Sequence, residues 1–183
     1  MATITNKKLM KIDDAQELIE FLSKNIYEKG NRSLCCKKDI DEYIKNVVSI
    51  IKFDNKYELS RIPIIITGVG ATLYEPYRWF SEEEKERLIN GFKKIGNSEI
   101  ANLLRQLFDL LVDLMKPTLG NLDPYEVVKN MEYYDKLLKP VMEENHRKFL
   151  KFTELESDFH KLYDRNSIFN NVKNYIKMQR KDL

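Results

Sequence analysis

The sequence predicts an all-α fold, a single-domain antiparallel array of about seven to nine helices. Two observations support this prediction. Apolar residues recur every three or four positions along most of the 183-residue chain, and each well-marked segment opens with a helix-start signal. The chain has only 6 Gly and 5 Pro, without a Ser/Gly linker or an internal repeat. We therefore treat residues 1–183 as one helical domain.

The first two predicted helices cover residues 13–28 and 38–53. Asp13 or Asp14 can cap the first helix, and Gly30 can end it. The second helix opens with three acidic residues, Asp39, Asp41 and Glu42. Their charge suits the positive end of a helix dipole, so both segments are expected to be amphipathic helices.

The segment between residues 57 and 80 has a different pattern. Residues 61–67 form a continuous, mostly β-branched run, and Gly68 and Gly70 follow it. So short a run fits either an interrupted buried helix or a short strand. A helix is favoured for residues 60–72 because no second strand is apparent for pairing, and a strand remains the alternative.

A helical hairpin is predicted next. Ser81 and Glu84 form a capping box, in which each side chain bonds the other residue's backbone amide. The helix that starts there should stop at Gly96, after which Ser98 can cap a second helix with a leucine-rich face. The turn between the two helices is very short, which is typical of a helical hairpin.

The remainder of the chain is also predicted to be helical. Asp123 precedes a proline, a combination that predicts a helix over residues 124–138. A further helix is expected over residues 141–152. The chain then closes with two helices that begin near Thr153 and Ser167, and their apolar residues at helical spacing should build the core. These residues are Leu155, Phe159, Tyr163, Tyr175 and Ile176.

Composition narrows the classes of partner. The 31 Lys and Arg nearly balance the 29 Asp and Glu, so the formal charge of +2 argues against polyanion binding and against wholesale nucleic-acid mimicry. No apolar run suits a signal peptide or a membrane span, which predicts a cytoplasmic protein without a membrane partner. The adjacent Cys35 and Cys36 offer neither a disulfide framework nor a zinc motif.

Catalytic chemistry has few candidate residues. The two histidines, His146 and His160, lie outside any metal-binding motif, although Glu143 precedes His146 at helical spacing. The glycines of residues 68–70 lack the third glycine of a dinucleotide fingerprint. We therefore expect no catalytic, cofactor or metal site. An enzyme built from Glu143, His146 and the aromatic cluster around residues 74–79 is the least favoured hypothesis.

That aromatic cluster is the one candidate interface in the sequence. Tyr, Trp and Arg are favoured at interface hot spots, and this segment combines them at Tyr74, Tyr77, Arg78 and Trp79. Packing between helices in the core is the alternative.

Two parts of the chain resemble the bacterial DNA-mimic protein family. Residues 91–104 contain a helix followed by Ile-Gly and then an Ala-x-x-Leu helix, and residues 154–163 and 172–176 are similar to the family's closing helices. The resemblance spans about residues 70–180 and implies an all-helical fold and a protein-binding role. The family's Asn-Gly-Gly-Phe signature is absent, and a charge of +2 does not support DNA mimicry itself.

The leading hypothesis is a non-enzymatic bacterial protein that binds another protein, namely an immunity protein that neutralises a toxin. Such a protein needs only a rigid surface that covers its partner's site. The alternative is a regulator that binds DNA or a DNA-binding protein.

Overall fold

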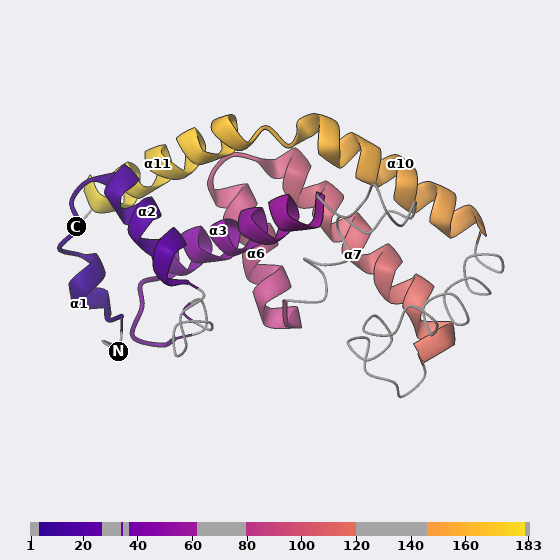
Figure 1. Ribbon diagram of the computed structural model, residues 1–183, viewed down its shortest axis with the longest axis horizontal. Helices are drawn as coiled ribbons and strands as arrows, with labels where there is room; N and C mark the ends of the chain where they lie inside the picture. The colour runs from indigo at the N-terminus through magenta and orange to yellow at the C-terminus, as the bar shows by residue number, and fades with distance from the viewer. Residues whose placement is uncertain (1–3, 27–33, 35–36, 62–79, 120–145, 182–183) are drawn as a thin grey trace.

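A computed structural model of the chain describes residues 4–26, 34, 37–61, 80–119 and 146–181 (Figure 1). These residues form helices and turns without a strand, which confirms the all-α prediction. The helices are α1 (Asn6–Leu9), α2 (Ala15–Asn25), α3 (Glu42–Arg61), α6 (Glu82–Lys94), α7 (Ser98–Leu119), α10 (His146–Leu162) and α11 (Arg165–Lys181).

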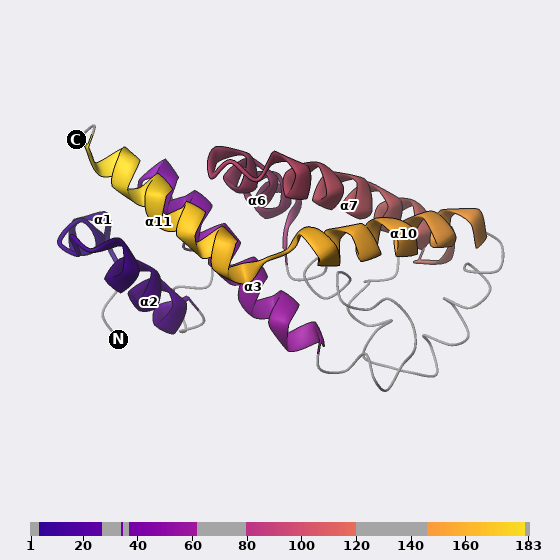
Figure 2. The same cartoon turned by 90° about the horizontal axis from the view of Figure 1, so that it is seen from above.

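Helix α3 lies at the centre of the array, in contact with α2, α6 and α11. Helix α7 packs against α6 and α10. The two closing helices follow each other along one side of the molecule, α10 beside α7 and α11 beside α3 (Figures 1 and 2). In both pairs the neighbouring helices run in opposite directions, which confirms the predicted antiparallel arrangement.

An aromatic cluster joins α3, α6 and α10. Its members are Phe53, Tyr57, Phe92, Phe159 and Tyr163, all buried. The ring centroids of Tyr57 and Tyr163 are 4.6 Å apart, and the Phe53 ring meets Phe92 and Phe159 edge-on, each at 5.9 Å. Edge-to-face pairs at these distances stabilise a core beyond the area that they bury.

The core of the closing helices confirms a prediction. All five residues named from helical spacing are buried: Leu155, Phe159, Tyr163, Tyr175 and Ile176. The apolar stripe of this part of the chain therefore faces the interior, and a functional surface must use other residues.

The predicted helix caps are also confirmed. The Asp14 carboxylate accepts from the amides of Gln16 and Glu17, both at 2.9 Å. The capping box is complete, because the Glu84 amide donates to the Ser81 hydroxyl at 3.3 Å and the Ser81 amide donates to the Glu84 carboxylate at 2.9 Å.

Gly96 ends α6 as predicted. Its φ of 85° lies in the left-handed region, where glycine is favoured because it has no side chain. The Asn97 amide donates to the Phe92 carbonyl at 2.8 Å, which satisfies one of the last carbonyls of the helix.

The starts of three helices differ from the predicted positions, by four residues in α3, one in α7 and two in α11. Helix α3 begins at Glu42, because Asp41 accepts the first helical bond from the Lys45 amide, and it continues to Arg61. Helix α7 begins at Ser98, so Asn97 rather than Ser98 occupies the cap position. Helix α11 begins at Arg165, after Asp164, whose carboxylate accepts from the Asn166 amide at 3.1 Å.

The predicted break near Thr153 was also wrong. Helix α10 passes through this residue without interruption, and the Thr153 hydroxyl donates to the Leu150 carbonyl at 2.8 Å. A threonine that satisfies its hydroxyl within the helix does not need to start a new one. The predicted helix over residues 124–138 lies outside the described residues, as do residues 62–72, for which helix and strand competed.

Candidate functional site

A groove of about 660 Å³ lies between α2 and α11. The second half of α2 forms one wall with Ile19, Glu20 and Lys24, and the first half of α11 forms the other. These two helices come from opposite ends of the chain, and they lie side by side in both views (Figures 1 and 2). The groove therefore exists only in the folded protein.

Arg180 fixes one end of this arrangement. Its guanidinium donates to the backbone carbonyls of Asp13 at 2.9 Å and Leu9 at 3.3 Å, and it also contacts the Ile12 carbonyl. Three carbonyls of the α1–α2 connection thus bind one side chain near the end of α11. This contact holds the start of α2 against the end of α11.

Asp54 of α3 fixes the other end. Its side chain is 1% exposed and accepts hydrogen bonds from Arg165 Nε at both oxygens, at 3.1 and 3.0 Å, while Arg165 Nη2 lies 2.9 Å from Oδ2 as an ion pair. The Tyr163 hydroxyl donates to the same carboxylate at 3.1 Å. A fork of this kind holds the guanidinium in one orientation, so Arg165 is placed at the edge of the groove by a buried anion.

Tyr163 stays protonated in this environment. Burial raises the pKa of its hydroxyl well above the ordinary value, and the charge of Asp54 and the hydrogen bond to it raise the pKa further. The phenol therefore remains a donor to Asp54 throughout the physiological range. It ties the junction between α10 and α11 to α3.

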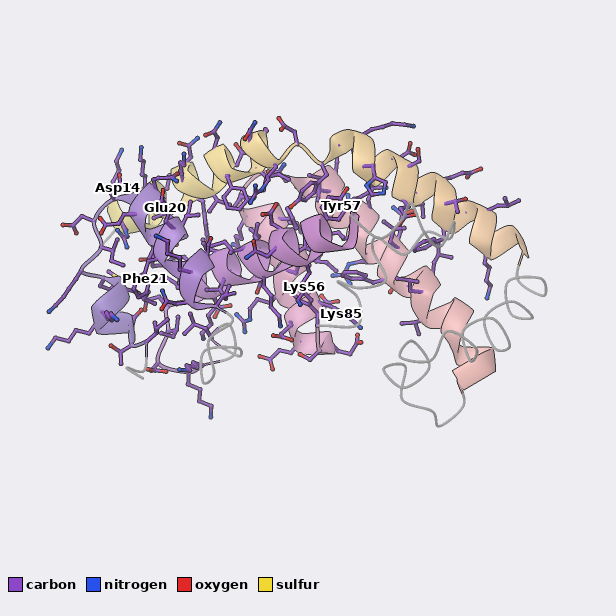
Figure 3. All side chains as sticks on the ribbon, in the orientation of Figure 1. Asp14, Glu20, Phe21, Lys56, Tyr57 and Lys85 are labelled. Carbon is purple, nitrogen blue, oxygen red and sulfur yellow. The ribbon has the colours of Figure 1, made fainter. Side chains whose placement is uncertain are left out.

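The groove wall contributed by α11 is basic. This helix carries five cationic residues and no carboxylate: Arg165, Lys173, Lys177, Arg180 and Lys181. Of these, Arg165 and Lys173 line the groove. On the opposite wall, Glu20 accepts a 2.8 Å hydrogen bond from Gln16 (Figure 3). The Arg165 guanidinium also lies over the Phe169 ring, 5.5 Å from its centroid.

A second groove, of about 490 Å³, separates α7 from α10. Its lining mixes Glu99 and Asp158 with Lys161, and Lys161 pairs with Asp158 at 2.9 Å. Leu162 lies at its edge and is 43% exposed. Because Lys161 and Asp158 pair with each other, Glu99 is the remaining charge among the described lining residues, and this groove lacks the cations that line the groove between α2 and α11.

His160 has a structural setting. Its Nδ1 contacts the hydroxyl of Tyr57, which is buried at the end of α3 (Figure 3), and the two rings lie 5.5 Å apart. A general base needs access to a substrate, and this nitrogen instead faces a phenol within the aromatic cluster. We interpret the pair as part of the packing of α10 on α3.

Most of the site residues predicted from sequence are not described by the structure. Tyr74, Tyr77, Arg78 and Trp79 fall outside the described residues, as do residues 68–70, Cys35, Cys36 and Glu143. His146 is the first residue of α10, and the structure does not describe its side chain.

The described residues show neither a metal-binding cluster nor a helix suited to crossing a membrane. Among them, no group of three metal-ligating side chains comes together. No helix in the described ranges combines the length and apolarity that a membrane crossing requires.

Sequence reasoning missed the groove between α2 and α11. A signal was present, because residues 165–181 contain five cations and no acid within a chain whose charges are otherwise balanced. Judging charge over the whole chain concealed this asymmetry, since net charge carries no information about where charges gather.

No protein-family model matches the chain, and neither a curated protein nor a solved structure is significantly similar to it. The resemblance to the DNA-mimic family therefore stays a prediction, and a functional proposal has to start from the groove.

Proposed function

We propose that this protein acts by binding another protein through the groove between α2 and α11, as an immunity protein that neutralises a toxin. The observation that carries the proposal is the groove itself, in which Arg180 ties the start of α2 to the end of α11 and Asp54 ties the start of α11 to α3. A surface that is ordered before binding loses little entropy when a partner docks.

The side chains of the groove suit recognition better than catalysis. They include cations, carboxamides and the half-buried ring of Phe169, which are groups that bind and orient a partner. Ser23 is the one hydroxyl-bearing residue among the described lining residues, and neither histidine nor cysteine accompanies it there. An activated nucleophile needs such a base beside it.

The toxin-neutralising role has more general support. An immunity protein works by covering its partner's site, so it needs a compact, rigid body and no reactive group. The antiparallel helical array provides such a body. The resemblance over residues 70–180 to the DNA-mimic family, which implies a protein-binding role, points in the same direction.

Growth protection tests this proposal. The product of the adjacent gene is expressed in a sensitive host, alone or with the wild-type protein, and survival is counted. We expect the wild-type protein to restore growth and the Lys173→Glu variant, altered in the groove, to protect less. Lys151→Glu makes the same charge change on an exposed part of α10 and should protect fully. If the wild-type protein restores no growth against a toxic neighbour, the immunity role is wrong.

A second candidate function is binding to DNA, as a regulator. The observation that favours it is the basic, carboxylate-free α11, which also carries four asparagines. Phosphate contacts are commonly made by such residues. A gel mobility shift that reports an affinity for DNA falling steeply with salt concentration would support this alternative. The absence of a shift would exclude direct binding to DNA.

A further inference from the structure

We infer that the groove between α2 and α11 binds an acidic polypeptide segment of the partner, whose carboxylates pair with Lys24 and Lys173. This inference rests on the proposed function, because it names the chemistry of the partner at the same groove. The charge, the amides and the apolar floor of the groove support it.

The charge balance of the groove favours an anion. Among the described lining residues, the cations are Lys24, Arg165 and Lys173, and the carboxylate is that of Glu20. Asp54 already balances Arg165 through three hydrogen-bonding contacts within 3.1 Å. The two lysines therefore exceed Glu20 by one positive charge, and Glu20 is engaged by Gln16 at 2.8 Å. A carboxylate that enters between the walls meets a net positive potential.

Polar and apolar groups complete a polypeptide site. The carboxamides of Gln16, Asn166 and Asn170 are exposed at the groove. Each carries both donors and acceptors, as the backbone of an extended peptide does. Ile19 is buried and Phe169 half-buried beneath them, so an apolar side chain of the segment has a surface to cover.

The wall formed by α2 argues against a nucleic acid as the occupant. Two exposed carboxylates on this helix, Glu17 and Glu20, follow two more at its start, Asp13 and Asp14. A duplex carries one phosphate charge about every 1.7 Å and would lie against these acids as it followed α11. A polypeptide can place single carboxylates at the lysines and avoid the acidic side.

The test uses three fluorescent probes of equal length, about twelve residues or nucleotides each. They are a peptide of Glu, Asp, Leu and Gly, the same peptide with Gln and Asn in place of its acids, and a single-stranded DNA. Fluorescence anisotropy at physiological salt gives a dissociation constant for each probe with the full-length protein. We expect the acidic peptide to bind at least about fivefold more tightly than either other probe.

Two variants that change the charge of the groove in opposite directions test whether the acidic peptide binds there. Lys173→Glu should weaken binding of the acidic peptide about fivefold or more, whereas Glu20→Lys should tighten it about threefold. Lys177→Glu is the matched control, because it makes the same charge change one turn further along α11 and outside the groove lining. It should alter binding less than twofold. Circular dichroism confirms that each variant is folded.

Three results would overturn the inference: equal binding of the acidic and amide peptides, stronger binding of the DNA, or equal losses in Lys173→Glu and Lys177→Glu. The growth test separates this failure from failure of the proposed function. Protection by the wild-type protein together with no preference for the acidic peptide would retain the immunity role and place its contact surface elsewhere.

Discussion

Two arginine–carboxylate pairs in this protein have similar nitrogen–oxygen distances, but their carboxylates have very different surroundings. Arg165 donates to Asp54 at 2.9–3.1 Å, and Arg105 donates to Glu86 with its two terminal nitrogens at 2.8 and 2.7 Å. The Asp54 side chain is 1% exposed, whereas that of Glu86 is 55% exposed. The first pair links α3 to the closing helices, and the second links α6 to α7.

The comparison shows that geometry alone does not determine what an ion pair contributes. Water screens the exposed pair and can replace either partner, so its contribution is small even with good distances. Water replaces a lost partner of a buried carboxylate poorly, so the removal of a cation that pairs with it leaves the charge less well stabilised. The pair at Asp54 should therefore be sensitive to mutation and the pair at Glu86 tolerant.

The largest expected effect comes from Arg165→Gln. The variant removes the cation from a buried anion, and we expect the free energy of unfolding to fall by about 2–4 kcal/mol in urea titration. Arg165→Lys keeps the charge and loses the fork, so its loss should be intermediate. A loss below about 0.5 kcal/mol in Arg165→Gln, typical of a surface substitution, would contradict the comparison.

Tyr163→Phe should cause the second-largest loss in the free energy of unfolding. It removes a hydroxyl that donates to the same buried charge, and bonds to charged groups contribute about 1.5–3 kcal/mol. Tyr175→Phe is the matched control, since the Tyr175 hydroxyl accepts from the neutral amide of Asn46 at 3.3 Å. Its loss in the same urea titration should be about 0.5–1.5 kcal/mol. Equal losses in the two variants would show that the charge of Asp54 has no special effect.

Alkaline pH should test the same hydroxyl. Because the pKa of Tyr163 is raised in the folded protein, its unfolded form loses a proton near pH 10.0 while the folded form keeps it. The stabilisation is therefore complete below the unfolded pKa and declines as pH rises above it. We expect the Tm to fall more steeply between neutral pH and strong alkali in the wild type than in Tyr163→Phe. Parallel plots of Tm against pH for the two proteins would contradict this expectation.

The smallest effect is expected at the exposed pair. Glu86→Gln should lower the free energy of unfolding by about 0.2–1 kcal/mol in the same urea titration. The hydrogen bond from Arg105 lowers the pKa of Glu86, so the wild-type pair stabilises the fold above the unfolded value of 4.5 and loses this effect as pH falls through the folded pKa. A loss as large as that of Arg165→Gln would remove the distinction between the two pairs.

Much of the helical architecture could be predicted because its signals are local. Asp14, the pair Ser81 and Glu84, and Gly96 all act on backbone groups within a few residues of themselves, so neighbouring sequence is sufficient to recognise them. Thr153 misled the same reasoning, because a hydroxyl that can cap a helix can also bond a carbonyl within one.

The candidate site could not be predicted in this way. Asp54 resembles any acid on an amphipathic helix until α10 and α11 cover it, and Lys24 and Lys173 share a groove only after α2 and α11 pack together. By itself the sequence determined that the chain is helical, where the strongest caps lie and which faces are apolar, because those signals act over a turn or two. The tertiary structure decided which charges are buried and which share a groove, because both depend on packing between residues far apart in the chain.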